Sequence, residues 1–412
     1  MATMTHLNRV RRKRSVKRNL RYLLIFLAMA VGVVACVLGV QMVWQSSWVE
    51  KAAMQIASIG NGGGYPVTLE GKTVRQMQAF GPDLAVLTDT TFQVHNSSAK
   101  VIQNTQHHLS NPQARYSSVR ALLYERGGKK AAVYSSKRVL HEKSFDNAIF
   151  TGAISDSGTW AVATQGTRDV ALVYVYNKAG DELFIWHSQE RVADVALSPD
   201  GKTLAVTTLV AQDGILNTNV WLFDVGSKKQ TKTITLADQM VVGTHFLNNS
   251  EFFAVTDRQS SVITKNGVVK YQYGYSGQTL SGYSFGQGKY LAVVLGDYEN
   301  FKESTLLILD SKCEEVGKAS IQSQILDLYA GDKVTVLTQD GILEYSFTGE
   351  LLREHEASNT GLLVTQVKGQ AYLCTPTGIE KVKLKGAASS SSPESGSSQE
   401  PSEASQEASS SQ

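Results

Sequence analysis

Residues 282–286 read Gly-Tyr-Ser-Phe-Gly and match the G-x-S-x-G pattern that presents a nucleophilic serine in α/β-hydrolases. In those enzymes the serine occupies a sharp turn between a strand and a helix. In this chain the motif lies inside a β-rich run, a Gly-Gln-Gly turn follows it, and no helical pattern comes next. We therefore expect Ser284 to be a strand residue without a catalytic role.

The residue types that bind metals are scattered along the chain. The pair His107-His108 stands in an expected loop, where solvated histidines are commoner than metal ligands. The acids of Asp297-Tyr-Glu-Asn300 lack the spacing and the glycine of a calcium loop. The cysteines form no C-x-x-C pair. The sequence predicts no catalytic residue, no metal site and no cofactor.

Short strands must position all of these residues. Residues 192–225 contain three β-rich runs, with the turn Ser198-Pro-Asp-Gly201 after the first, and residues 228–236 supply a fourth run. In that turn, proline presets φ and glycine accepts positive φ. The four runs predict one antiparallel meander of four strands.

The same meander recurs from Tyr65 to about Lys385. A period of about 40–45 residues with four strands per unit is typical of a β-propeller blade. A β-sandwich, the other all-β candidate, does not predict a series of similar units. We predict an all-β chain with a single propeller of eight blades at residues 65–385, with seven as the alternative count. The second strands should start near Leu84, Ala121, Trp160, Leu204, Phe252, Leu291, Val334 and Ala371.

The last unit, residues 361–384, supplies only three runs. The stretch Tyr65–Leu69 is a lone strand ahead of the first full unit, so we expect it to complete the last blade. Closing the ring with strands from both ends hides edges that would otherwise pair with other chains.

The loops within the propeller differ in length between its two faces. Turns between strands one and two, and between strands three and four, are short and share one face. The loops between strands two and three, including the predicted loops 208–219 and 296–304, share the other face with the connections between blades. Loops on a rigid scaffold are where binding concentrates, and tyrosine offers wide contact area at small entropic cost. Candidate partner-binding residues on this long-loop face are Gln212, Asp213, Tyr273, Tyr275, Asp297, Tyr298 and Phe301; packing of the aromatics between blades is the alternative.

The N-terminal part reads as a membrane anchor. Residues 1–21 carry eight basic groups and no acid, and the apolar run that follows, residues 22–44, is long enough to cross a bilayer as a helix. The positive-inside rule places the N-terminus in the cytoplasm and the rest of the chain outside. A cleaved signal peptide and a lipobox at Cys36 are the rival interpretations, but the apolar run continues past that cysteine.

The remaining segments flank the propeller. Residues 45–64 form a juxtamembrane segment and a glycine-rich linker, with residues 60–64 expected to be a flexible joint. The tail, residues 386–412, is rich in Ser and Glu, contains no aromatic residue, and is expected to be disordered. The basic N-terminus and the acidic tail leave the body close to neutral, so we expect no nucleic-acid partner.

Three motifs resemble a known family of uncharacterised, membrane-anchored, WD-repeat-like β-propeller proteins of Gram-positive bacteria, described only as a domain of unknown function. They are residues 120–128 (RALLYERGG), residues 151–158 (TGAISDSG) and residues 194–201 (DVALSPDG). The resemblance implies the order of a basic tail, one span and a propeller, and a location in the cell membrane. It implies no activity.

These features predict a non-catalytic binding or scaffolding module that a single span anchors outside the cytoplasm. The expected partner is a protein or a glycan of the cell envelope. The alternative is an enzyme with a site at the mouth of the central channel. A channel mouth lined with titratable groups would favour the enzyme, and an aromatic-rich loop face would favour binding.

Overall fold

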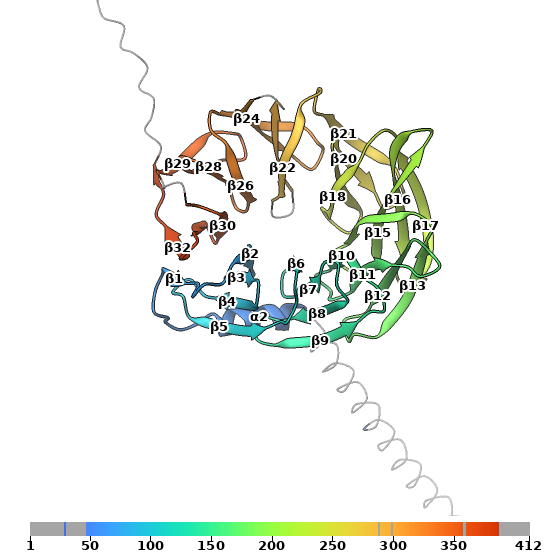
Figure 1. Cartoon of the computed structure of the whole chain (residues 1–412), viewed down its shortest axis with the longest axis horizontal. Coiled ribbons are helices and arrows are strands. Elements are labelled where there is room, and N and C mark those ends of the chain that lie inside the picture. The colour runs from blue at the N-terminus through green and yellow to red at the C-terminus, as the bar shows by residue number, and fades with distance from the viewer. Residues whose placement is uncertain (1–28, 30–46, 287–288, 298–299, 357–359, 387–412) are drawn as a thin grey trace, which may run out of the picture.

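The computed structural model describes residue 29 and residues 47–386, apart from 287–288, 298–299 and 357–359. These residues form eight antiparallel sheets arranged in a ring around a central channel (Figure 1). The predicted eight-bladed propeller is therefore confirmed. No helix among the described residues has the length and apolar character that a bilayer crossing requires. The predicted span, the basic N-terminus and all but the first residue of the tail lie outside the described residues.

The first four blades each contain four strands, which follow one another from the channel outward. Blade 1 is β2 (Val74–Phe80), β3 (Asp83–Thr88), β4 (Thr91–His95) and β5 (Val101–Gln106). Blade 2 is β6 (Pro112–Tyr116), β7 (Ala121–Glu125), β8 (Lys130–Tyr134) and β9 (Val139–Ser144). Blade 3 is β10 (Ile149–Ile154), β11 (Trp160–Gln165), β12 (Ala171–Tyr176) and β13 (Glu182–Ser188). Blade 4 is β14 (Arg191–Leu197), β15 (Thr203–Gln212), β16 (Ile215–Asp224) and β17 (Lys229–Leu236).

The second half of the ring follows the same plan. Blade 5 is β18 (Val241–Phe246), β19 (Glu251–Thr256), β20 (Gln259–Thr264) and β21 (Val269–Gly274). Blade 6 is β22 (Thr279–Phe285), β23 (Leu291–Asp297), β24 (Asn300–Leu309) and β25 (Glu315–Ile321). Blade 7 is β26 (Ile325–Ala330), β27 (Val334–Thr338), β28 (Gly341–Tyr345) and β29 (Leu351–Glu356), with β33 (Lys385–Gly386) as a fifth, outer strand. Blade 8 is β30 (Leu363–Val367), β31 (Gln370–Cys374), β32 (Gly378–Val382) and β1 (Val67–Thr68).

Strand β1 closes the ring as predicted. It pairs antiparallel with β32, with Val67 opposite Ile379. Leu69 beside it is buried, and the ring of Tyr65 packs 5.1 Å from that of Tyr372. The N-terminal end of the propeller thus supplies the outermost strand of its last blade.

The second strand of each blade carries most of the core. All six residues of β3 are buried, as are all five of β27. A strand buried on both faces reads as a continuous apolar run, and these runs made the repeat visible in the sequence. Large side chains fill the space between blades: Trp160 is fully buried and stacks on Tyr176 with ring centroids 4.1 Å apart. Burying each such side chain contributes roughly 1.5–3 kcal/mol.

Two predicted loops are instead extensions of strands. Strands β15 and β16 pair as far as Gln212 and Ile215, which leaves only the turn Asp213-Gly214 between them. Both turn residues have positive φ, which fits the Asp-Gly preference of a two-residue hairpin turn. Likewise, β23 runs to Asp297 and β24 starts at Asn300. The prediction of loops at 208–219 and 296–304 was therefore wrong, because the polar strand ends read as loop.

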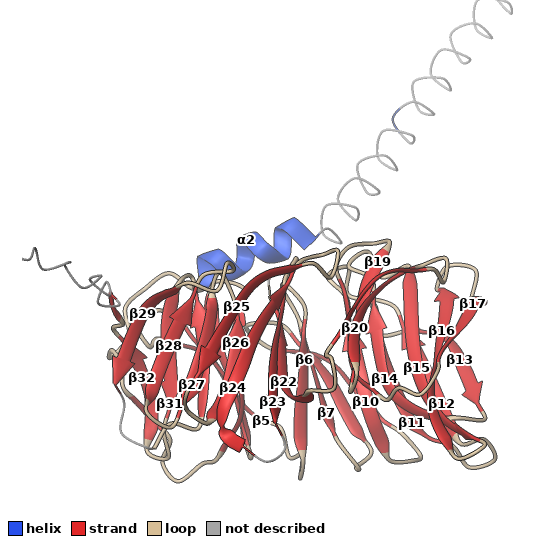
Figure 2. Ribbon diagram, turned by 90° about the horizontal axis from the view of Figure 1, so that it is seen from above, coloured by secondary structure: helices blue, strands red, loops and turns tan. Residues whose placement is uncertain are grey.

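Helix α2 (Ser47–Ala57) lies on the face formed by the short turns (Figure 2). Glu50 of the helix accepts from Nη2 of Arg120 at 2.7 Å and pairs with Nζ of Lys178 at 2.8 Å. Met54 is buried against the blade 1 turn at Gly81. The face that the sequence predicted to carry long loops, still called the long-loop face below, is therefore the face opposite α2. The predicted difference in length was wrong, because loops between strands two and three on this face, such as residues 213–214 and 257–258, are only two residues long.

The glycine segment after α2 is docked rather than free. The amide of Asn96 donates to the carbonyl oxygens of Ser58 and Gly60, both at 2.8 Å. The backbone N–H of Gly62 donates to Oγ of Ser98 at 3.1 Å, and a Cβ on Gly62 would lie 2.1 Å from the backbone nitrogen of Lys100. Glycine is thus required at this position for close approach of two backbones, whereas the sequence suggested a flexible joint.

Candidate functional site

The β15–β16 hairpin carries two of the residues that the sequence proposed for partner binding. Gln212 and Asp213 are both exposed at its tip. Two apolar side chains beside them, Ile215 and Leu216, are also exposed. Long paired strands hold this tip rigidly, so the four side chains form one fixed polar and apolar surface on the long-loop face.

The two candidate tyrosines after blade 5 have different environments. Tyr273 is half-buried, and its hydroxyl donates to Oε2 of Glu315 at 2.7 Å. Burial, and then this carboxylate, raise the pKa of Tyr273 to about 12. Tyr275 is only 1% exposed, packs between blades 5 and 6, and shares a hydrogen bond with Ser260. For Tyr275, packing between blades is therefore the role that the structure gives.

The remaining three candidates belong to the β23–β24 hairpin. Asp297 is the last residue of β23 and Phe301 is the second residue of β24. Tyr298 lies outside the described residues. This hairpin and the β15–β16 hairpin both point to the long-loop face and belong to blades 6 and 4.

Exposed apolar side chains gather at the long-loop end, a feature that the sequence did not reveal. Of the ten large apolar side chains that the described propeller residues expose, seven lie at this end. They are Val170, Ile215, Leu216, Met240, Val242, Leu326 and Leu362. Apolar residues exposed near one another mark surfaces that bind other molecules.

The two faces also differ in charge. The described segments that join strands at the short-turn face contain twelve basic and seven acidic residues. The corresponding segments at the long-loop face contain five basic and nine acidic residues. The chain is therefore polarised across the ring, with the positive side under α2.

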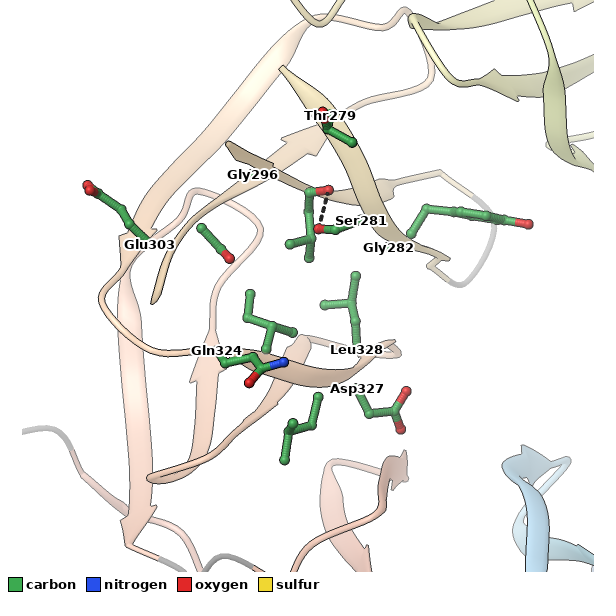
Figure 3. Close-up of a pocket in the computed structure, with 13 residues that line it drawn as sticks. Thr279, Ser281, Gly282, Gly296, Glu303, Gln324, Asp327 and Leu328 are labelled. Carbon is green, nitrogen blue, oxygen red and sulfur yellow. Dashed lines mark hydrogen bonds between the residues drawn. The ribbon is translucent and has the colours of Figure 1, made fainter. Parts of the chain in front are cut away.

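A pocket of about 420 Å³ opens between blades 6 and 7 at the long-loop end. One wall comes from the start of β22 and from the β23–β24 hairpin, and the other from residues 324–328 at the start of β26 (Figure 3). Its lining mixes hydroxyl groups, the Gln324 amide and two carboxylates, Glu303 and Asp327, with aliphatic side chains. No lysine, arginine or histidine is among the described residues that line it.

A missing contact between blades explains why the pocket is there. In blades 1 and 4, the residue after a bulge in the innermost strand accepts from a backbone N–H of the next blade: Gln76 from Ala114 at 2.6 Å and Asp194 from Thr244 at 2.9 Å. Asp327 does the same in blade 7. In blade 6 the corresponding residue is Gly282, which has no side chain to bridge the gap. Blade 5 also has a glycine at this position, Gly243, but there the side chain of Tyr283 from blade 6 occupies the space.

Asp327 is the acid of the pocket whose pKa departs from its ordinary value. Its Oδ2 accepts from the backbone N–H of Val364 at 2.8 Å. Burial raises the pKa of Asp327 to about 6, although the backbone N–H groups of Val364 and Leu328 favour the ionised form. This carboxyl group therefore titrates close to neutral pH.

Asp194, in one of the motifs that carry the family resemblance, is a structural residue. It is buried, and its two oxygens also accept from Thr151 at 3.3 Å and from the hydroxyl of Thr244 at 2.7 Å. Nη2 of Arg115 lies 3.4 Å away. These contacts join blades 2 to 5 around the channel and leave the carboxylate committed to the scaffold.

The serine and the histidine that the sequence analysis considered for catalysis or metal binding also have structural roles. Ser284 lies within β22, where its Oγ accepts from the backbone N–H of Ala330 at 2.9 Å. His107 is buried with Nε2 near the carbonyl oxygen of Thr88 and Nδ1 accepting from Leu109. Among the described residues no three His, Cys, Asp or Glu side chains are placed to hold a metal ion.

The geometry defines the class of protein as an eight-bladed β-propeller with WD-repeat-like blades. Residues 65–384 match the model of a family of unknown function, DUF5711, so the chain belongs to that family. The match covers the propeller and leaves the membrane anchor as a prediction.

A solved structure shares the fold, and a second gives a weaker match. The crystal structure of the C-terminal WD40 domain of Sif2 is 10% identical, with 78% of this chain and 99% of that chain covered and a TM-score of 0.58. BamB from Moraxella catarrhalis is 11% identical, with 77% and 95% covered and a TM-score of 0.49. At these identities the likeness is one of fold alone. No curated protein matches the chain in sequence.

Proposed function

We propose that the chain is a non-catalytic scaffold that a single membrane span, residues 22–44, holds outside the cytoplasm. Its long-loop face binds a protein of the cell envelope. The observation that carries this proposal is the position of α2: the helix occupies the short-turn face and leaves the long-loop face open. That open face carries seven of the ten exposed apolar side chains of the described propeller.

A protein partner fits this surface better than a glycan. Sugar sites commonly present exposed aromatic rings, but Tyr275 is buried and the hydroxyl of Tyr273 is engaged by Glu315. Among the described residues, this end exposes several aliphatic side chains and carries more acidic than basic groups. Such a surface complements a partner with apolar and basic side chains.

Catalysis at the channel mouth remains the alternative, and the near-neutral titration of Asp327 is the observation that favours it. A general acid or base needs a reacting partner within hydrogen-bond reach. The pocket hydroxyl of Ser281 donates to the carbonyl oxygen of Val294 at 3.1 Å, and that of Tyr283 donates to Val242 at 2.8 Å. These hydroxyl groups stabilise the blades, so we favour binding.

Site-specific crosslinking in intact cells tests the proposal. A photoreactive phenylalanine replaces Ile215 on the long-loop face or, as the matched control, Val268 on the short-turn side, since both side chains are about half exposed. We expect Ile215 to yield one defined protein adduct and Val268 to lack it. The same adducts from both positions would refute a long-loop binding face. The absence of any adduct from Ile215, and from two further positions on that face, Met240 and Leu362, would refute it too.

A further inference from the structure

Helix α2 exposes an apolar stripe on the side that faces away from the propeller. Trp48 and Ile56 are 62% and 66% exposed, and Ile59, in the turn after the helix, is 70% exposed. Residues 48, 52, 56 and 59 fall on one side of an α-helix, because they follow the spacing of three and four residues that returns to the same face. Ala52 completes the stripe and is also exposed.

The opposite side of α2 is fixed to the blades. Glu50 bonds Arg120 and Lys178, Met54 is buried, and Ser58 donates to Asp83 at 2.6 Å. Burial disfavours the charge of Glu50, but the two cations outweigh it and hold its pKa below the usual value. The helix cannot roll to bury its apolar stripe without breaking these contacts.

Chain length limits what can cover the stripe. The predicted span ends at residue 44 and α2 starts at Ser47. Three residues reach at most about 11 Å when fully extended, so a span ending at the bilayer surface holds the start of α2 next to the lipid. The short-turn face around the helix has the basic excess described above, which suits an anionic bilayer.

We propose that α2 lies in the interface of an anionic bilayer, with Trp48, Ile56 and Ile59 at the boundary between headgroups and acyl chains. The short-turn face then rests on the membrane, and the long-loop face points away from it. A helix that exposes apolar side chains on one side, and whose other side is bound to the propeller, is suited to this position. The inference rests on the proposed membrane anchor and adds a fixed orientation to it.

Spin labels measure the depth of α2 directly. The full-length chain, with its three native cysteines replaced by alanine, receives one nitroxide at position 56 or 59 through I56C or I59C. The matched control is I215C, an exposed apolar position on the long-loop face. The chain is reconstituted in nanodiscs of phosphatidylglycerol and phosphatidylcholine, and collision rates with dissolved oxygen and with a water-soluble nickel chelate are compared.

We expect labels at 56 and 59 to collide at least about threefold less with the chelate than the label at 215, and more with oxygen, because apolar reagents concentrate in the bilayer. Equal chelate access at all three positions in a chain that resists carbonate extraction would overturn the inference and leave the anchor intact. A chain that carbonate extracts, but whose labels at 56 and 59 become protected on added anionic vesicles, would retain the inference and overturn the anchor. Exposure of the labels in an extractable chain would overturn both.

Discussion

Glu344 shows how a single buried charge can hold the outer part of a blade. Its side chain is fully buried on β28, and both of its oxygens accept from Arg353, at 2.8 and 2.7 Å. Nζ of Lys333 lies 3.3 Å away, and the Gln366 amide of blade 8 donates at 3.0 Å. The carboxylate thus joins three strands and two blades. No pattern in the local sequence predicts these contacts.

We expect Glu344→Ala to lower the free energy of unfolding by about 1.5–3 kcal/mol, because it removes a charged acceptor from Arg353 and leaves the buried Gln366 amide without that partner. Urea unfolding followed by fluorescence measures the change. The matched control is Glu251→Ala, which removes the exposed pair with Lys270 (2.8 Å) and should cost about 1 kcal/mol or less. Equal losses in the two variants would contradict a structural role for the buried network.

Asp327 predicts a pH dependence of stability. Its pKa is about 6 in the folded chain and about 3.9 when unfolded, so the folded state binds the proton more tightly. The contribution of Asp327 to stability therefore falls as pH rises from about 4 to about 6 and stays lower above that range. The lowered pKa values of His95, His107 and His245 act in the opposite direction. The neighbouring Cys374 does not titrate there, since burial and then Asp327 raise its pKa to about 11.

Asp327→Asn should remove this dependence and stabilise the chain at pH 7.5 by about 1–3 kcal/mol, since the side-chain oxygen still accepts from Val364. Thermal unfolding of both proteins at pH 4.5 and pH 7.5 measures it. The pocket carboxylate Glu303 is exposed, so Glu303→Gln serves as the control and should leave the pH profile unchanged. A difference in stability between wild type and Asp327→Asn that is the same at both pH values would refute the assignment.

At the residue scale, sequence reasoning identified roles that depend on local context. Ser284 was expected to be a strand residue and lies within β22, whereas His107, expected to be a solvated loop histidine, is buried. The contacts of Asp194 with three other blades, and that of Glu344 with Gln366 of blade 8, were missed. Contacts between residues up to 79 positions apart leave no periodic trace in one sequence.

At the scale of elements, α2 and the segment after it form one docked unit. Helix α2 forms within the segment that the sequence analysis assigned as juxtamembrane, and the glycine run concealed how tightly residues 58–64 are held. Five residues rich in glycine read as flexible because the sequence does not show what they pack against. The blade 1 turn at residues 96–100 supplies those contacts.

Gly62→Ala tests this docking. Its Cβ would lie 2.1 Å from the backbone nitrogen of Lys100, so the segment must move away from the turn. We expect hydrogen exchange at residues 96–100 to accelerate at least about tenfold, with a local cost of order 1–3 kcal/mol. Gly63→Ala is the control, since a Cβ there meets nothing within 4 Å. Unchanged exchange in Gly62→Ala would show that the segment is not held.

The strand pattern itself was predicted closely. Each second strand begins within one residue of its expected start, from Asp83 in blade 1 to Gln370 in blade 8. These strands are buried on both sides, so their apolar runs are unambiguous. The hairpin tips were misread because exposed strands carry the polar composition of loops.

At the scale of the whole molecule, the ring depends on closure by β1. Without it, β32 would expose an unpaired edge at the rim of blade 8. The repeat count and the incomplete last unit made this closure predictable, because a last blade with only three predicted strands needs a fourth strand from elsewhere in the chain. The fifth strand of blade 7, β33, was not predicted, since two residues are too few to form a pattern.

Replacing residues 65–69 with a Gly-Ser segment of equal length should therefore open the ring while keeping α2 attached. The change removes buried Leu69 and the packing of Tyr65 on Tyr372, so we expect a loss of about 4 kcal/mol or more. The exposed β32 edge should also promote pairing between chains, because an unpaired edge strand is a template for another strand. Thermal unfolding and light scattering on a sizing column measure the two effects. Replacing residues 387–412 by the same kind of segment is the control and should alter neither, and an opened ring that stays monomeric with an unchanged midpoint would show that β1 does not close it.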